Sequence, residues 1–485
     1  MKKVFIYLYC IMSFFIFIPE IVPANQDTLS REVKELRSLI IEMKNDYESR
    51  LNDMQDKIAK LENKKPEDKK EDMLIQYGTG GTSPLTSTVS TAPPLNNTAT
   101  NQFVNSSTDS WSPAQPISLW NTGKSFANIS FDGLFTAAAS TANDLEMLET
   151  GDHDPIQRGF TAANEEIAFD GAIDPYFRGF SNIVYTLNKA GETSVELEET
   201  YLTTFSLPLN LQVKAGTFFT EFGRINPTHP HTWNFADQPL VNGRFFGQDG
   251  LRNPGARVSW LAPTDNYTEL FFTVQDSQGE TATSFRNNDG LFGRKAVETR
   301  VRNMKDLLYV PRITTMFELT DTQTLLLGAS AAYGPNSTGT DKNTLIYGID
   351  AFWKWKSKHA SYGFPFVKWQ TEVMGRRFEA GEDADANLSS DVMHNWGAYS
   401  EVTWGFKKRW VAGLRGDYVD GLKGATDPSG VERLRISPNL TFYPSEFSKL
   451  RLQYNYDEIL GNDNTEQSLF LQFEFLMGSH GAHKF

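Results

Sequence analysis

The stretch Ser468-Leu-Phe-Leu-Gln-Phe-Glu-Phe-Leu-Met477 decides the fold class of this chain, because apolar and polar residues alternate along it. Successive side chains of a β-strand point to opposite faces of a sheet, so a period of two predicts a strand with two unlike faces. One face is formed by Leu469, Leu471, Phe473, Phe475 and Met477, and the other carries Ser468, Gln472 and Glu474.

The two segments before this stretch show the same alternation over a similar length. Apolar positions alternate with Arg433, Arg435 and Asn439 in one segment and with Arg451, Gln453 and Asp457 in the other. Runs of about ten to twelve residues exceed the usual strand length and suit a tilted strand that crosses a bilayer. Aromatic residues gather towards the ends of such runs, as an interfacial girdle requires: Trp353, Trp355, Trp369 and Trp404.

Roughly sixteen such segments occur after Ser125, an even number as expected for a bacterial barrel. They lie near residues 126–138, 163–173, 176–188, 193–206, 210–220, 255–262, 266–275, 306–319, 323–333, 343–356, 362–378, 394–407, 408–420, 432–443, 448–459 and 466–477. Short connections such as Asp174-Pro175 and Ser445-Glu446 alternate with longer ones. We therefore predict an all-β transmembrane barrel of about 16 antiparallel strands in residues 125–485, with short periplasmic turns and longer outer loops.

The N-terminal residues predict export. Lys2 and Lys3 precede an apolar run from Val4 to Ile18, and small residues end at Ala24, so residues 1–24 resemble a secretory signal peptide. The run is shorter than the roughly 20 residues of a spanning helix. Cys10, the single cysteine of the chain, lies inside it, so the mature protein has no disulfide. A net charge of −14 argues against nucleic acid as a partner.

Two further segments precede the barrel. Residues 25–65 predict a periplasmic α-helical coiled coil, because apolar residues recur at steps of four and three without proline or glycine: Leu29, Val33, Leu36, Ile40, Met43, Tyr47, Leu51, Met54, Ile58 and Leu61. A single amphipathic helix on a core is the alternative. Residues 66–124 are rich in Ser, Thr, Pro and Gly and predict a flexible linker.

The barrel region resembles bacterial porins, most nearly the phosphate-selective porin O and P group. The resemblance rests on Leu211-Gln-Val-Lys-Ala-Gly-Thr-Phe-Phe-Thr-Glu-Phe-Gly223 and on the terminal aromatic Phe485. It implies a channel in the outer membrane, in contact with lipid and lipopolysaccharide, and a homotrimer. The coiled coil would lie in the periplasm and could contact peptidoglycan.

Residues 221–255 form the third long loop, which in porins of this strand count folds into the lumen and narrows the pore. Its prolines and aromatics favour packing against the inner wall over an external cap. The charged candidates of this constriction are Glu221, Arg224, His229, His231, Asp237, Arg244, Asp249 and Arg252. Arg415, Arg433, Arg435 and Arg451 are predicted on the lumen wall opposite. These charges either create a transverse field or pair with one another.

Neither a metal site nor a cofactor is predicted. The pairs His229/His231 and His480/His483 are candidate metal ligands, but each lacks a third ligand in the sequence pattern. No hydrolase elbow, phosphate loop or His-Glu-x-x-His motif occurs, so we expect no enzyme. A diffuse Ser/His hydrolase and a TonB-dependent receptor of about 22 strands are lesser alternatives.

The expected function is therefore passive diffusion of small hydrophilic solutes or ions through an outer-membrane porin. Two alternatives remain open at this point. One is a structural barrel with a closed pore that tethers envelope layers, and the other is a substrate-specific channel for anions, phosphate or metal ions.

Overall fold

The computed structural model describes residues 117–478 except 123–124, 173, 423–430 and 461–463. All of these residues belong to one compact unit, Phe103–Phe485. The predicted signal peptide, the coiled coil, most of the linker, the pair His480/His483 and Phe485 lie outside the described residues.

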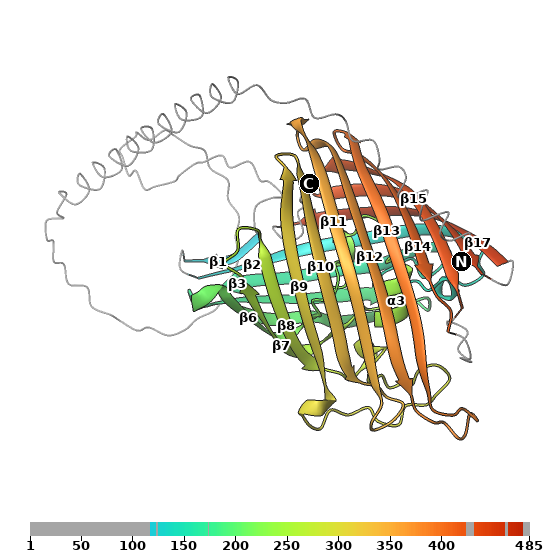
Figure 1. Cartoon of the computed structure of the whole chain (residues 1–485). Helices are drawn as coiled ribbons and strands as arrows, with labels where there is room; N and C mark the ends of the chain where they lie inside the picture. Colours follow the sequence, from blue (N-terminus) through green and yellow to red (C-terminus); the bar gives the residue numbers. More distant parts are fainter. Residues whose placement is uncertain (1–116, 123–124, 173, 423–430, 461–463, 479–485) are drawn as a thin grey trace, which may run out of the picture. The chain divides into compact units, whose positions relative to one another are not determined.

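Sixteen antiparallel strands, β2 to β17, form a closed barrel (Figure 1), because each strand pairs with the next and β17 pairs with β2. Their bounds are β2 Phe126–Ser140, β3 Gly159–Ala172, β4 Phe177–Leu187, β5 Thr193–Thr204, β6 Leu211–Phe219, β7 Arg252–Leu261, β8 Thr268–Asp276, β9 Leu307–Thr320, β10 Gln323–Pro335, β11 Asn343–Ser361, β12 Phe364–Ala380, β13 Asp391–Lys407, β14 Trp410–Val419, β15 Arg433–Ser445, β16 Ser448–Ile459 and β17 Asn464–Met477. Each overlaps one predicted segment, so the predicted barrel of sixteen strands is confirmed.

A short additional strand precedes the barrel strands. β1, Ile117–Asn121, pairs with residues 126–129 of β2, whereas β17 pairs with residues 131–140. Since β3 occupies the other edge of β2, β1 continues the line of β17 along the same edge. These five residues fall in the range predicted as linker, so the sheet begins before residue 125.

Connections alternate between short and long around most of the barrel; the exception is the connection between β4 and β5, residues 188–192, which is as short as its neighbours. Two residues join β9 to β10, β11 to β12, β13 to β14 and β15 to β16. Tyr362 and Gly363 both have positive φ, 53° and 87°, as a two-residue hairpin turn requires. At the other end, residues 141–158, 220–251 and 277–306 form long loops.

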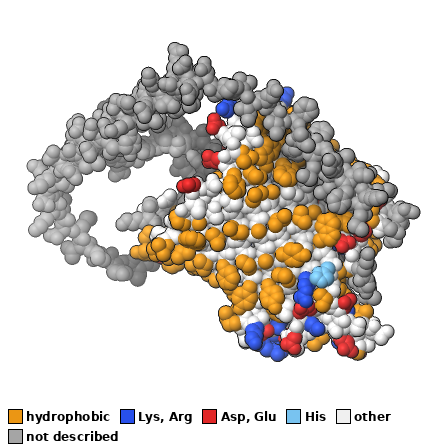
Figure 2. All heavy atoms as spheres, viewed as in Figure 1, with side chains coloured by type: hydrophobic (Ala, Val, Ile, Leu, Met, Phe, Trp, Pro, Cys, Tyr) orange, Lys and Arg blue, Asp and Glu red, His pale blue; other side chains and the backbone are white. Residues whose placement is uncertain are grey.

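The barrel has an apolar outside and a polar inside. Leu469 and Leu471 of β17 are 46% and 51% exposed, whereas Gln472 and Glu474 on the opposite face are almost completely buried. Figure 2 shows hydrophobic side chains over most of the visible outer face, with charged side chains gathered at the end that carries the long loops. This distribution fits a barrel whose outer face contacts lipid and whose interior is polar.

Helical segments occur only as short pieces within the described residues. They are α3 Leu240–Phe246 and the 3-10 turns η1 Glu146–Leu148, η2 Pro208–Asn210, η3 Pro230–Thr232, η4 Glu280–Ala282 and η5 Met304–Asp306. Across this part of the chain, no helix is long and apolar enough to cross a membrane.

The segment that joins β6 to β7, residues 220–251, packs inside the barrel and is called the lumen loop below. Its helix α3 lies against β13 and β14. Leu240 and Val241 join a buried apolar cluster with wall residues such as Met374 and Tyr399. This packing fixes the lumen loop against one part of the wall.

Candidate functional site

The lumen loop is tied to inward-facing side chains of several strands. Glu372 of β12 accepts hydrogen bonds from the backbone N–H groups of Arg224 and Ile225, each at 3.0 Å. Asn234 donates through Nδ2 to Glu401 of β13 at 2.7 Å. The start of the loop is thereby held by carboxylates of the wall.

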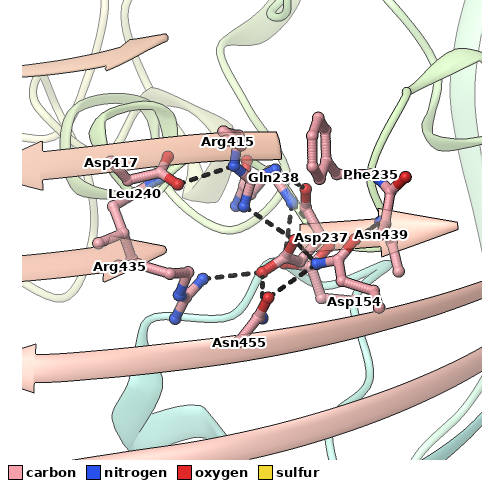
Figure 3. A network of polar contacts seen from close by, with 12 residues as sticks. Asp154, Phe235, Asp237, Gln238, Leu240, Arg415, Asp417, Arg435, Asn439 and Asn455 are labelled. Carbon is pink, nitrogen blue, oxygen red and sulfur yellow. Dashed lines mark hydrogen bonds and ion pairs between the residues drawn. The ribbon is translucent and has the colours of Figure 1, made fainter. Parts of the chain in front are cut away.

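Asp237 is the centre of the next set of contacts (Figure 3). Its carboxylate accepts hydrogen bonds from Arg415 at 2.8 Å, Arg435 at 2.9 Å, Gln453 at 2.6 Å and Asn455 at 2.8 Å. Burial alone would raise the pKa of Asp237, but the charges of Arg415 and Arg435 outweigh it and lower this pKa. The loop therefore presents to strands β14 to β16 a carboxylate whose ionised form is favoured.

The four predicted lumen arginines all lie on the inner wall, but they bind the loops and not open solvent. Arg451 donates to the backbone oxygens of Trp233 and Phe235, each at 2.8 Å. Arg433 donates to the backbone oxygen of Met147 at 2.8 Å. Arg415 and Arg435 bind Asp237 in the same way. These contacts favour the alternative in which the lumen charges are engaged by partners inside the barrel, over the alternative in which they create a transverse field.

The remaining charged residues predicted for the constriction are distributed over several neighbours. Arg224 donates to Gln370 of β12 at 3.1 Å. Arg252 belongs to β7, because that strand starts at Arg252 and not near residue 255 as predicted. The ion pairs in this region are Glu221 with Arg257, Arg244 with Glu149, and Arg252 with Glu196. Burial and the charge of Asp152 raise the pKa of Asp249 to about 7.

His229 and His231 turn away from the arginines towards acidic side chains of β2, β3 and β5. His229 Nδ1 lies 2.9 Å from Glu198 Oε2, and its Nε2 lies 2.9 Å from Glu199 Oε2. His231 Nδ1 lies 3.0 Å from Asp132 Oδ2 and 3.4 Å from Glu166 Oε1. The two imidazole rings are stacked, with centroids 5.6 Å apart.

A β-bulge brings Glu198 and Glu199 to the same face. Asn182 of β4 pairs with Glu199, but the next residue, Ile183, pairs with Leu197, so Glu198 is the extra residue. A bulge redirects side chains in this way and is common beside functional sites. His153, from the loop between β2 and β3, completes the group, with Nε2 3.4 Å from Glu198 Oε1.

We refer to Asp132, Glu166, Glu198, Glu199, His153, His229 and His231 as the His–carboxylate cluster. Burial disfavours the charged form of His231, but Glu166 and Asp132 outweigh it and raise the pKa of His231 to about 10. The pKa of His229 is raised well above its ordinary value, against burial, by Glu198 and Glu166. Without a bound cation, the neighbouring carboxylates therefore favour the protonated form of both imidazoles.

Sequence reasoning found the two histidines of the loop but not their partners. Alternation places Asp132 and Glu166 on the polar faces of β2 and β3, and this was the available signal. No local pattern relates these carboxylates to a loop that follows them by sixty or more residues.

Two polar pockets lie along the wall formed by β5. The outer pocket, about 680 Å³, reaches Ser194 and Glu196 and is bordered by the long loops. The inner pocket, about 490 Å³, reaches Glu199, Tyr201 and Thr203 near the other end of the strand. Glu198 lies between them, and the three steps from Glu196 to Glu199 correspond to about 10 Å of strand.

The outer pocket is strongly acidic. Arg244 and Arg376 are the basic residues that line it within the described part of the chain. Its acidic residues are Glu146, Glu149, Asp152, Glu196, Asp249, Glu280 and Asp289. The net charge of the residues that line this outer pocket, the mouth of the barrel, is therefore negative, even after Glu149 pairs with Arg244.

No family model matches the chain. An uncharacterized protein of Aquifex aeolicus (strain VF5) is 30% identical over 350 residues, which is 68% of this chain and 71% of that protein. Among solved structures, the outer membrane channel DcaP of Acinetobacter baumannii matches with a TM-score of 0.49, at 13% identity over 74% of this chain and 99% of that one. An anion-selective porin from Comamonas acidovorans matches with a TM-score of 0.46, at 8% identity over 73% and 100%.

Proposed function

The chain belongs to the same family as this Aquifex aeolicus protein, and we propose that it is an outer-membrane porin through which small hydrophilic solutes or ions diffuse. The observation that carries the proposal is the closed barrel with an apolar outer face and a polar pocket towards each end of the lumen. An apolar exterior is suited to lipid, and polar pockets inside are suited to water and solutes.

The diffusion path we propose runs along the β3 to β6 side of the lumen. The lumen loop is held on the opposite side, where its backbone and side chains bind β12 to β16, and its residues His229 and His231 reach β2, β3 and β5. Both pockets share the wall formed by β5, and about 10 Å of strand separates them at Glu198. The lumen loop then acts as the constriction, and its residue His229 borders the inner pocket.

The proposed path favours cations over anions. Acidic side chains outnumber arginines at the outer pocket, and a mouth lined by one sign of charge concentrates ions of the other sign. The arginines that would suit phosphate are engaged by Asp237 and by backbone oxygens. This geometry favours the cation-preferring pore over the anion or phosphate channel.

The remaining parts of the chain extend this proposal to the envelope. Residues 1–24 would direct export, residues 25–65 would form a periplasmic coiled coil, and residues 66–124 would link it to the barrel. A coiled coil brings chains together, which agrees with a homotrimer held in the outer membrane, in contact with lipopolysaccharide and peptidoglycan.

Single-channel recording of the purified chain without residues 1–24, in a planar bilayer with a salt gradient, tests the proposal. We expect stepwise conductance and a reversal potential whose sign shows cation preference. Triplet steps would support the trimer. A folded, heat-modifiable barrel without conductance would contradict the porin and favour the tethering role, and anion preference would contradict the proposed path.

A further inference from the structure

Two groups of metal-ligand side chains meet where the lumen loop contacts β2, β3 and β5. The first consists of Asp132, Glu166 and His231, and the second of Glu166, Glu198 and His229. In each group, one ligand atom from every residue lies within 4.8 Å of the others. Glu166 belongs to both groups, so its carboxylate lies between the two histidines.

The distances within these groups suit a small divalent cation. Zinc binds imidazole nitrogen and carboxylate oxygen at about 2.0–2.2 Å in tetrahedral geometry, which places its ligand atoms about 3.3 Å apart. His231 Nδ1 lies 3.0 Å and 3.4 Å from its two carboxylates. His229 Nδ1 lies 2.9 Å from Glu198 and 3.6 Å from Glu166. In each group, the two distances lie on either side of the separation of about 3.3 Å that is expected between zinc ligands.

The arrangement of the buried carboxylates of Asp132 and Glu166 also favours a bound cation. Asp132 and Glu166 lie directly opposite each other on β2 and β3, and like charges in this position destabilise a strand pair. Both side chains are almost completely buried. Asp132 Oδ1 and Glu166 Oε2 accept no hydrogen bond from the described residues, although buried carboxylate oxygens normally have partners.

Neighbouring groups orient the ligands as in known metal sites. Glu199 lies 2.9 Å from His229 Nε2, so a proton held there leaves the Nδ1 lone pair facing Glu166 and Glu198. A carboxylate on the distal nitrogen of a ligating histidine is a common supporting contact. Asn182 donates to Glu198 at 2.7 Å and fixes that carboxylate. Glu199 and Asn182 are thus positioning residues.

We propose that this cluster binds divalent transition-metal ions such as Zn²⁺, in two adjacent positions that share Glu166. The mixed imidazole and carboxylate donors suit zinc and its neighbours better than calcium or magnesium, which take oxygen ligands alone. The inner pocket borders His229 and Glu199, which gives an ion a way in. The competing occupants are protons, because imidazolium ions could satisfy the same carboxylates.

Zinc titration of the mature, metal-stripped chain tests the site without any affinity tag. All samples carry His480→Ala and His483→Ala, so that the tail histidines do not contribute. Equilibrium dialysis with elemental analysis should give two zinc ions per chain. Glu166→Gln should lose both ions, and Asp132→Asn should retain one. Glu199→Gln should keep the stoichiometry but weaken zinc binding by roughly 10–100-fold.

The matched control is His359→Gln/His394→Gln, which removes two exposed histidines outside the cluster and should retain both ions. Folding of each variant is checked by heat-modifiable migration. X-ray absorption of the zinc-loaded protein without cluster substitutions should show imidazole scattering, and this readout does not depend on a variant folding. No tight binding, one ion per chain, oxygen-only coordination or retention of both ions by folded Glu166→Gln would overturn the proposal.

Discussion

Arg415 of β14 holds Asp237 of the lumen loop at two points. Its Nη1 donates to the backbone oxygen of Asp237 at 2.7 Å, and its Nη2 donates to Oδ1 at 2.8 Å. Both side chains are about 1% exposed. A bidentate, buried contact of this kind fixes the position of the loop, because a shift of the loop would break two charge-assisted hydrogen bonds and leave Asp417 as the carboxylate partner of Arg415.

Replacing Asp237 by Asn should weaken both the barrel and the constriction. Arg415 and Arg435 would lose their shared negative partner and keep Asp417 and Asp457 as their remaining carboxylate partners. A hydrogen bond to a charged group contributes about 1.5–3 kcal/mol. We expect a decrease of this order in the free energy of unfolding, measured with urea in lipid vesicles. Single-channel recordings should show larger or noisier conductance, because the loop is less firmly held.

Asp385→Asn is the control for this prediction. Asp385 pairs with Lys295, and both side chains are largely exposed, at 81% and 61%. Exposed pairs contribute about 0–1 kcal/mol, so stability and conductance should stay near wild type. Equal effects of the two substitutions would refute the role given to the buried pair.

Neutralising the outer mouth should reduce cation preference. Glu280 and Asp289 line the outer pocket and are exposed, so Glu280→Gln/Asp289→Asn removes two charges with little effect on folding. We expect the reversal potential to move towards zero, with the cation-to-anion permeability ratio reduced by roughly twofold.

Asp321→Asn provides the comparison for the mouth variants. Asp321 lies in the two-residue turn between β9 and β10, at the opposite end of the barrel from the long loops, and its side chain is 87% exposed. Its removal should leave the reversal potential unchanged. The same shift in both variants would mean that total charge, and not the outer pocket, sets the preference.

A charge on the lipid-facing side of β17 should destabilise the barrel according to depth. Leu471 is 51% exposed on the outer face in the middle of the strand, and Thr465 lies on the same face near its outer end. Leu471→Arg should cost about 2–4 kcal/mol and Thr465→Arg about 0–1 kcal/mol, measured by urea unfolding in bilayers. Equal costs would argue against a membrane-embedded outer face.

The stability of the barrel should depend on pH through Asp154. Burial, and then the charge of Asp237, raise the pKa of Asp154 from 3.8 to about 7. The folded chain therefore binds more protons than the unfolded chain between about pH 4 and pH 7. The free energy of unfolding should decrease as pH rises through this window, by a few kcal/mol at most, and then level off.

Asp154→Asn removes this titration and keeps an oxygen that can accept the hydrogen bond from the backbone N–H of Gln238. Urea unfolding between pH 4 and pH 8 should show a flatter dependence than in wild type. Asp341→Asn, at an exposed loop position, should keep the wild-type slope. A slope unchanged by Asp154→Asn would show that another group is responsible.

The barrel itself was predictable because its signal is local. In β17, every second residue lies on the outer face. The apolar residues Leu469, Leu471 and Phe473 therefore predict both the strand and which of its faces is the outer one. Short connections such as Asp174-Pro175, which lies between β3 and β4, mark the strand ends in the same local way. The inward direction of Arg415, Arg433, Arg435 and Arg451 followed from the same alternation.

What the lumen loop contacts was decided only by the tertiary structure. Barrel closure joins β17 to β2 and surrounds the loop with side chains from distant parts of the chain, so Asp237 meets Arg415 and His231 meets Asp132. The bulge at Glu198 also breaks the alternation on which sequence reasoning depends. The sequence alone thus determined the strands and their two faces, whereas the pairing of the lumen charges and the His–carboxylate cluster arise from contacts that no local periodicity encodes.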